Sequence, residues 1–448
     1  CQTINIPADY STIQAGIDAA YEGATVLVAA GTYVENILWP GNTNGIKLIG
    51  EDRETTIIDG GAQQTVIQIS SSSIDTSTLI SGFTITNGSG GNGGGIFCMY
   101  SSPSLVNLTI SGNVASSGGG ISCYNSSSPR LENVTISGNV ASFGGGVFCQ
   151  VSTPSFENVT ISGNSCSEKG AGVHCYLSSP SFENVTISGN VAGTGGAGMS
   201  CDESSPSLVD VMISDNVANT GAGGMHCYGG SIPSLVNVTI TGNSSTVDEI
   251  GGIYSGGSQP ILLNSILWNN TPEEVVLLWG SLTATYSDIK GGWEGEGNID
   301  VDPLFCNADS SDFTLYSNSS CVGAGENGAN MGALGVGCEG ENGCMDSLAT
   351  NYNPEANWDD GSCEYPDNGD YSLSFDGNND YVDGGTGSLG GNFTVSCWIK
   401  PSSIATNWAG FVSKNGTAGQ KVFWLGQHSI NGYLRFGVYL NGVNASSL

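Results

Sequence analysis

The chain has 448 residues, including 69 Gly and 14 Cys, and its 41 acidic residues against 9 basic ones leave a formal charge of −32. This charge argues against nucleic acid as a partner, because phosphates are neutralised by many Lys and Arg, and it repels polyuronate chains. No apolar run reaches the ~18 residues that span a bilayer. Many Cys in a lysine-poor chain favour an exported protein, and we expect a removed export signal before Cys1.

The first local signal along the chain is the segment STIQAGIDAA at residues 11–20, in which Ser11 and Gln14 have the spacing of a capping box. A capping box pairs a hydroxyl and a Gln or Glu side chain with the free backbone N–H groups of a helix N-terminus. We therefore expect a short helix here.

A repeated unit dominates residues 93–243, where it recurs six times with its Cys residues 25 or 26 positions apart. Two clear copies read GGGVFCQVSTPSFENVTISGN and GAGVHCYLSSPSFENVTISGN. Each unit contains three short runs with period-2 alternation, too short for a sandwich, and no helical period. Three strands in ~25 residues are typical of one coil of a parallel β-helix, in which equivalent positions stack ~4.8 Å apart.

The columns of this stack can be read from the repeat. Two inward columns are apolar: Leu105, Leu131, Phe156, Phe182, Leu208 and Leu235 form one, and Ile110, Ile136, Ile161, Ile187, Ile213 and Ile240 form the other. A Cys column also faces inward, where its members pack as small apolar side chains: Cys98, Cys123, Cys149, Cys175, Cys201 and Cys227. Two Asn columns occupy turns, where stacked amides can pair with backbone groups: Asn107, Asn133, Asn158, Asn184, Asn237; Asn113, Asn139, Asn164, Asn190, Asn216, Asn243.

The unit resembles the right-handed β-helix repeats of the pectate-lyase-like superfamily, which includes many bacterial surface and secreted proteins. Residues 11–20 look like the helix that caps the start of such solenoids, and GNIDVDPLFCNADSSDF through MGALGVGC resembles their closing segment. The resemblance implies an all-β protein whose right-handed parallel β-helix covers residues 1–338 with about 12 coils.

Residues 339–367 resemble a short module, rich in Asp, Asn and Cys, that lies between domains of bacterial secreted proteins. We expect a disulfide-pinned linker in which Cys344 pairs with Cys363, and Cys306 with Cys321 is a plausible second bridge. Five side chains offer the hard oxygen ligands that Ca²⁺ prefers: Asp346, Asn351, Asn353, Asp359 and Asp360. The alternative to a calcium site is a solvated linker.

Residues 368–448 combine alternating aromatic strands with Asn-Gly turns, which predicts an antiparallel β-jelly roll. The segment is similar to part of the laminin-G-like, concanavalin-A-like lectin family. About half of such a domain is present, and we expect the protein to continue beyond Leu448. The resemblance implies glycan binding, often with Ca²⁺.

The solenoid lacks the sequence signatures of the lyases and hydrolases built on this fold, and we predict no catalytic residues. One coil departs from its neighbours by carrying four carboxylates: Asp202, Glu203, Asp210 and Asp215. Drift on exposed turns is one interpretation of these residues, and a calcium or catalytic site is the other.

Aromatic residues one position from the Cys column form an outward strip that could contact sugar rings: Tyr124, Tyr176, Tyr228, His174 and His226. The alternative is packing of the ladder under longer loops. Because His174 and His226 lie two coils apart, ~9.6 Å by strand spacing, they are too far apart to ligate one metal ion.

These observations predict a secreted or cell-surface protein without enzymatic activity. Its rigid solenoid would present a lectin-like module to extracellular glycans or cell-surface polymers, as an adhesin or as a self-associating fibre subunit. Ca²⁺ is the one cofactor that these residues suggest. The alternative is a polysaccharide-degrading enzyme, a lyase or glycoside hydrolase, with a carbohydrate-targeting module.

Overall fold

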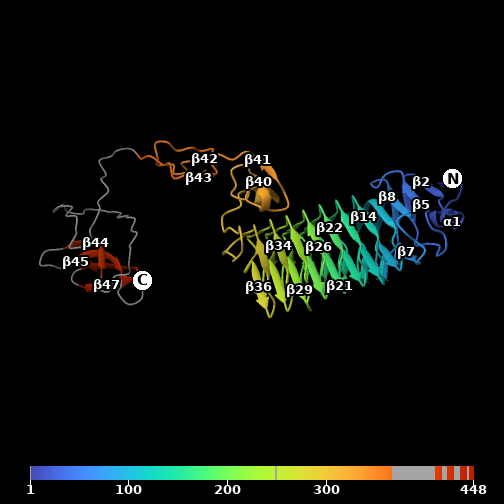
Figure 1. Cartoon of the computed structure of the whole chain (residues 1–448), viewed down its shortest axis with the longest axis horizontal. Coiled ribbons are helices and arrows are strands. Elements are labelled where there is room, and N and C mark those ends of the chain that lie inside the picture. Colours follow the sequence, from blue (N-terminus) through green and yellow to red (C-terminus); the bar gives the residue numbers. More distant parts are fainter. Residues whose placement is uncertain are drawn as a thin grey trace. The chain divides into compact units, whose positions relative to one another are not determined.

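The computed structural model describes residues 2–247 and 250–365, together with the backbone of four strands near the C-terminus (Figure 1). The chain divides into two compact units, Cys1–Asp367 and Asn368–Leu448. The first unit is an all-β parallel solenoid of about 13 turns, which confirms the predicted β-helix.

Three parallel sheets form the walls of the solenoid, and between residues 121 and 245 each coil contributes one strand to sheet B, two to sheet A and one to sheet C. Sheet A contains β1 (Thr3–Ile6), β2 (Thr25–Val28), β3 (Gly31–Val34), β5 (Lys47–Gly50), β6 (Thr56–Asp59), β8 (Leu79–Thr86), β11 (Ser104–Ser111), β14 (Arg130–Glu132), β15 (Thr135–Ser137), β18 (Ser155–Glu157), β19 (Thr160–Ser162), β22 (Ser181–Glu183), β23 (Thr186–Ser188), β26 (Ser207–Val209), β27 (Met212–Ser214), β30 (Ser234–Val236), β31 (Thr239–Thr241), β34 (Ile261–Leu263), β35 (Ile266–Trp268), β37 (Thr283–Thr285) and β38 (Asp288–Ile289). Sheet B contains β4 (Ile37–Leu38), β7 (Ile67–Ser70), β10 (Ile96–Met99), β13 (Ile121–Tyr124), β17 (Val147–Gln150), β21 (Val173–Tyr176), β25 (Met199–Asp202), β29 (Met225–Tyr228), β33 (Ile253–Gly256) and β36 (Val275–Leu278). Sheet C contains β9 (Ser89–Asn92), β12 (Val114–Ser117), β16 (Val140–Ala141), β20 (Ser165–Cys166), β24 (Val191–Ala192), β28 (Val217–Ala218) and β32 (Ser244–Ser245).

The register of the coils matches the predicted columns. Cys149 pairs with Cys123 on one side and with Cys175 on the other, and all three are fully buried. The Leu/Phe and Ile columns of sheet A are likewise in register and buried. Alternation of apolar and polar residues therefore turns one face of each strand into a continuous core along the solenoid axis.

The two Asn columns play different parts. The column that contains Asn164 is fully buried and forms an amide ladder, in which Nδ2 of each Asn donates to Oδ1 of the next. The column that contains Asn184 (φ 53°) instead occupies the turn between the two sheet A strands in the left-handed region, which Asn tolerates better than most residues.

A short helix, α1 (Ile13–Asp18), covers the N-terminal end of the core and buries Ile13 and Ile17. Its cap is Thr12, whose Oγ1 accepts from the backbone N of Ala15 at 3.2 Å, so the predicted Ser11 cap is off by one residue. The carboxylate of Glu35 accepts the N–H groups of Ile13 and Gln14 (both 2.9 Å), which satisfies two more of the free donors at the helix N-terminus.

The segment after the last coil forms a three-stranded sheet from β39 (Phe305–Asn307), β40 (Asp312–Tyr316) and β41 (Val336–Cys338), with two 3-10 turns, η1 (Ala308–Ser310) and η2 (Glu326–Gly328). We call residues 303–340 the C-terminal extension. Cys306 is bonded to Cys338, which corrects the predicted pairing of Cys306 with Cys321. Cys321 is a buried free thiol whose Sγ lies 3.1 Å from Oδ2 of Asp288, so it belongs to the packing between the extension and the last coil.

The linker module contains β42 (Asn342–Gly343) and β43 (Trp358–Asp359), and a disulfide joins Cys344 to Cys363 as predicted. In the second unit, β44 (Ala409–Asn415), β45 (Lys421–Gln427), β46 (Leu434–Leu440) and β47 (Val443–Ser447) form an antiparallel sheet. The rest of the predicted lectin-like segment lies outside the described residues, and the jelly roll stays a prediction. Among the described residues, no helix is both long and apolar enough to cross a membrane.

Candidate functional site

Asp202 lies on the outer face of sheet B between two tyrosines. Its strand β25 pairs in register with β21 and β29, so Tyr176, Asp202 and Tyr228 follow one another in a single outward column. Because strands stack ~4.8 Å apart, the two tyrosines are separated by ~9.6 Å with the carboxylate midway. Both rings face solvent, with exposed fractions of 37% for Tyr176 and 55% for Tyr228.

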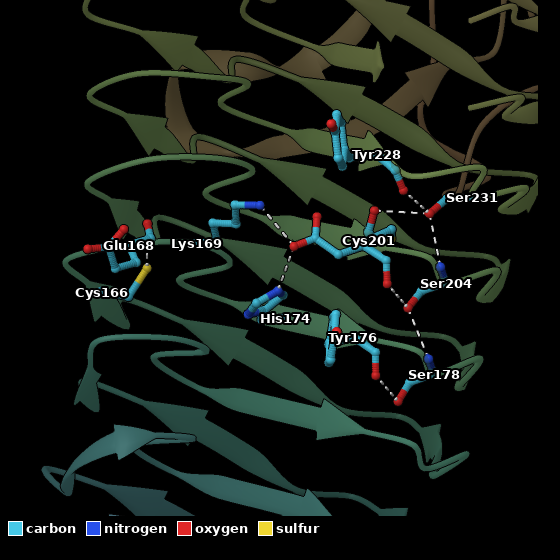
Figure 2. Close-up of polar contacts among 11 residues, drawn as sticks. Cys166, Glu168, Lys169, His174, Tyr176, Ser178, Cys201, Ser204, Tyr228 and Ser231 are labelled. Carbon is cyan, nitrogen blue, oxygen red and sulfur yellow. Dashed lines mark hydrogen bonds and ion pairs between the residues drawn. The ribbon is translucent and has the colours of Figure 1, made fainter. Parts of the chain in front are cut away.

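A ladder of serines holds this column in place. Ser204 donates from Oγ to the carbonyl of Asp202 (2.8 Å), and it accepts from the backbone N of Ser178 (3.0 Å). Ser178 and Ser231 make the same carbonyl bond in the coils on either side (2.9 and 2.7 Å; Figure 2). The spacing of the column is therefore set by hydrogen bonds between coils as well as by strand pairing.

Lys169 and His174 both contact one oxygen of Asp202. Nζ of Lys169 lies 2.9 Å from Oδ2, and Nε2 of His174 lies 3.3 Å from the same atom (Figure 2). Lys169 comes from the loop between β20 and β21, where its carbonyl accepts from the backbone N of Gly144 at 3.1 Å. Gly195 leaves room for the lysine stem, since a Cβ there would lie 2.9 Å from Cγ of Lys169.

The carboxylate of Asp202 stays ionised. Burial alone would raise its pKa, but the hydrogen bonds and positive charges of His174 and Lys169 outweigh burial and lower the pKa to about 2. Within the described part of the chain, Oδ1 of Asp202 and Nδ1 of His174 are buried without a hydrogen-bond partner. An unpaired buried polar atom is costly, so these atoms favour a ligand or water that supplies the missing bonds.

The remaining residues of the predicted aromatic strip have other contacts. His226 stacks on Tyr254 (ring centroids 4.7 Å apart, 10° between planes), and burial lowers its pKa to about 4. Tyr124 packs between Phe97 and Phe148, at 5.8 and 5.5 Å. Tyr124 therefore takes part in ladder packing, and the exposed rings of the strip are those beside Asp202.

The four carboxylates of the unusual coil lie along separate parts of it. Glu203 occupies the turn after β25, and Asp210 lies between β26 and β27 with Oδ1 accepting from Nδ2 of Asn237 (2.9 Å). Asp215 follows β27 and faces Ser311 of the C-terminal extension (3.3 Å). Asp202 is the member of this group that lies beside Lys169 and His174.

The predicted calcium ligands of the linker accept hydrogen bonds from the backbone, four of them in two-residue turns and Asn351 from Glu364 across the module. Oδ1 of each accepts a backbone N–H of the module at 2.7–3.1 Å: Asp346, Asn351, Asn353, Asp359 and Asp360. Among the described residues, no group of three or more His, Cys, Asp or Glu side chains is arranged to hold a metal ion. A calcium site stays a prediction that the arrangement of these side chains does not strengthen.

The pairing of Lys169 with Asp202 does not follow from the repeat pattern of the sequence. These residues are 33 positions apart and belong to different columns, one in a loop and one on a strand. Two features of the sequence could have pointed to this pair. Asp202 has a tyrosine at the equivalent position of the coil on either side, and Lys169 is one of 9 basic residues in the chain.

The fold and its in-register ladders define a right-handed parallel β-helix protein. The family described as a right handed beta helix region matches residues 23–192. Among solved structures, the crystal structure of pectate lyase Pel9A is similar with a TM-score of 0.51 and 15% sequence identity, over 75% of this chain and 96% of that one. No curated protein matches the chain.

The prediction that this protein is not an enzyme is contradicted by the structural comparison, because a pectate lyase has the same fold. The prediction rested on missing sequence signatures. At 15% identity a fold can be shared without such signatures, so their absence does not exclude catalysis.

Proposed function

We propose that this protein is a polysaccharide-degrading enzyme that binds its substrate along the outer face of sheet B, with Asp202 and Lys169 at the reactive centre. The observation that carries the proposal is the ion pair between these residues (2.9 Å) in a column flanked by two exposed tyrosine rings. The similar fold of a pectate lyase supports polysaccharide cleavage in general, without indicating the same substrate or the same cleavage chemistry.

The tyrosine column suits a sugar chain that lies across the strands. Tyr176 and Tyr228 offer flat apolar surfaces ~9.6 Å apart, on which sugar rings can stack on either side of Asp202. The side chain of Lys169 is 32% exposed, so its ammonium is accessible beside a bound chain, whereas the side chain of Asp202 is 14% exposed with Oδ1 buried and would act through its charge and through Lys169. This arrangement would place a glycosidic bond over the ion pair.

The ion pair can stabilise charge that develops when a glycosidic bond breaks. A carboxylate with a pKa of about 2 remains negative at every ordinary pH, and it can stabilise positive charge on the sugar ring. The ammonium of Lys169 can give a proton to the glycosidic oxygen as its bond to the anomeric carbon breaks, and a water molecule that attacks this carbon returns a proton to the lysine amine. Since the chain carries a net charge of −32, a neutral or sparsely charged polysaccharide is the favoured substrate.

The predicted lectin-like segment, residues 368–448, completes the proposal as a carbohydrate-targeting module. Its described strands β44–β47 form an antiparallel sheet, which agrees with a β-rich binding domain without identifying it.

The test measures release of reducing ends and of unsaturated sugars from a panel of neutral and acidic polysaccharides. We expect turnover of at least one polysaccharide, and we expect Asp202→Asn and Lys169→Met each to lower kcat/KM by about 100-fold or more. Asp210→Asn is the matched control, because it changes a carboxylate of the same coil to the residue that neighbouring coils carry there. Equal activity of Asp202→Asn and the unchanged protein would rule out this site, and absence of turnover on the whole panel would rule out the function.

A further inference from the structure

A groove of about 410 Å³ lies on the outer face of sheet A, away from the Asp202 site. Its floor consists of side chains from β19, β23 and β27, including Thr186 and Ser188. Phe313 and Leu334 of the C-terminal extension form its wall. This volume is in the range of pockets that bind small molecules, ~300–1,000 Å³.

Two departures from the repeat meet in this groove. The preceding coil carries Thr-Ile-Ser-Gly-Asn at residues 186–190 and the following coil Thr-Ile-Thr-Gly-Asn at residues 239–243, whereas this coil reads Met-Ile-Ser-Asp-Asn at residues 212–216. Met212 replaces the Thr of the outward column, and Asp215 replaces the Gly that follows the strand; both line the groove. The change at Asp215 adds an exposed carboxylate at a single place on an otherwise hydroxyl-rich face, while the side chain of Met212 is buried.

The carboxylate occupies a backbone position that favours glycine. Asp215 has φ 57°, and the equivalent Gly163, Gly189 and Gly242 have φ 62–65°. A side chain in the left-handed region is held there at a cost to stability, and such strain is commonly found at functional positions. Asp215 is exposed at the rim of the groove, where its carboxylate can reach a ligand.

We propose that this groove is a second glycan-binding site, which takes a neutral sugar unit of a polysaccharide chain. A pyranose has an apolar face and a ring of hydroxyls; the exposed side chain of Leu334 matches the former, and Asp215, Thr186 and Ser188 match the latter. A carboxylate accepts from hydroxyl groups more strongly than a neutral acceptor does. The carboxylate and the net charge of −32 both disfavour an anionic sugar.

The site adds to the proposed function but does not require turnover, because it is defined by binding. Its competing explanation is purely structural: Asp215 also contacts Ser311, at 3.3 Å, and this contact could serve to dock the C-terminal extension. The two explanations differ in what replacing Asp215 by the glycine of the neighbouring coils does to stability and to binding.

The experiment is calorimetric titration of the full chain, carrying Asp202→Asn to prevent turnover, with hexasaccharides of glucose, mannose or xylose and with oligogalacturonate as the anionic comparison. We expect a neutral hexasaccharide to bind more tightly than oligogalacturonate. Adding Asp215→Gly should weaken binding about tenfold or more, while Tm stays unchanged or rises. Ser188→Ala should weaken binding severalfold, whereas Ser137→Ala, the same column outside the groove, should leave it unchanged.

Several results would overturn the inference. These are no binding of any neutral hexasaccharide, unchanged affinity of Asp215→Gly, or loss of binding in Tyr176→Ala and Tyr228→Ala but not in Asp215→Gly. A fall in Tm together with faster hydrogen exchange of residues 305–338 in Asp215→Gly would assign Asp215 to docking of the extension instead. Absence of turnover would contradict the proposed function and leave this binding result to stand separately.

Discussion

Asn164 connects three successive coils through one buried amide. Its Nδ2 donates to the carbonyl of Ile136 and to Oδ1 of Asn190 (both 3.0 Å). Its Oδ1 accepts from both N and Nδ2 of Asn139 (both 3.0 Å). The core of a β-helix has sharp turns whose backbone groups cannot reach water, and this amide supplies their partners.

Replacing Asn164 by Leu should therefore lower the free energy of unfolding by about 3 kcal/mol, because several buried donors and acceptors lose their partners at about 1–3 kcal/mol each. Urea unfolding followed by circular dichroism measures the change. Asn184→Gly is the control, since Asn184 is an exposed left-handed turn residue and Gly adopts that conformation freely; its effect should stay within about 0.5 kcal/mol. If both variants changed the free energy of unfolding equally, the buried amide ladder would stabilise the fold no more than the exposed turn Asn does.

Asp288 gives the stability of the protein a dependence on pH. Burial raises its pKa to about 6 from an ordinary value of 3.8, so the folded chain holds this proton over a pH range in which the unfolded chain has lost it. The contribution of Asp288 to the free energy of unfolding is largest below about pH 4. It decreases by about 3 kcal/mol in all as the pH rises to about 6.

Asp288→Asn should remove this loss and raise Tm at pH 7, while the two proteins should be similar near pH 4. The measurement is Tm against pH for both proteins, because the difference between the curves isolates Asp288 from the other carboxylates. A constant difference from pH 4 to pH 7 would contradict a buried protonated Asp288.

At the scale of the element, sheet B carries a ladder of thiols inside the solenoid. Cys98, Cys123 and Cys149 follow one another in register and are fully buried. Strands ~4.8 Å apart separate their Cβ atoms by more than the ~3.5–4.5 Å of a relaxed disulfide. Burial also raises the pKa of Cys98 well above its usual value, which suppresses the reactive thiolate.

We therefore expect the native protein to resist alkylation, and at least eight thiols to react after denaturation without reductant. The eight are the buried free cysteines of the described residues: Cys98, Cys123, Cys149, Cys166, Cys175, Cys201, Cys227 and Cys321. Alkylation followed by mass spectrometry assigns each thiol. Disulfides between neighbouring members of the ladder would contradict the argument from strand spacing.

At the scale of the whole molecule, the solenoid is stabilised locally, because each coil is buried chiefly by the coils next to it. The C-terminal extension continues this pattern at the end of the solenoid. Leu315, Cys321 and Met331 of the extension pack against Ile266 of the coils, and the Cys306–Cys338 disulfide closes the segment. Loss of that bridge should act on the extension and the last coils, and leave distant coils unchanged.

Replacing both Cys306 and Cys338 by Ser should destabilise the extension by about 3–4 kcal/mol, the loop-closure contribution of a bridge that spans 32 residues. Hydrogen exchange with mass spectrometry should show faster exchange in residues 305–338 and unchanged exchange in residues 93–190. Acceleration throughout the solenoid would show that the chain unfolds as one cooperative unit.

The repeat in the sequence was enough to predict the coil, its strands in sheets A and B, the inward columns and the buried position of the Cys ladder, but not the short strands of sheet C such as β16 and β20. A strict repeat makes this possible, because each residue contacts the equivalent residue of the next coil. Residues at equivalent positions of successive repeats can therefore be predicted to be in contact. The pairing of Cys344 with Cys363 was also within reach, because both lie in one short module.

The tertiary structure alone decided contacts between positions that are not equivalent. Lys169 reaches Asp202 from a loop, Cys306 pairs with Cys338 across a folded extension, and Thr12 rather than Ser11 caps the helix. The candidate site and the groove beside Asp215 both arise where one coil breaks the repeat and a loop or a later segment packs against it. Periodicity predicts the repeated contacts of a solenoid, and the local path of loops and of the closing segment decides the rest.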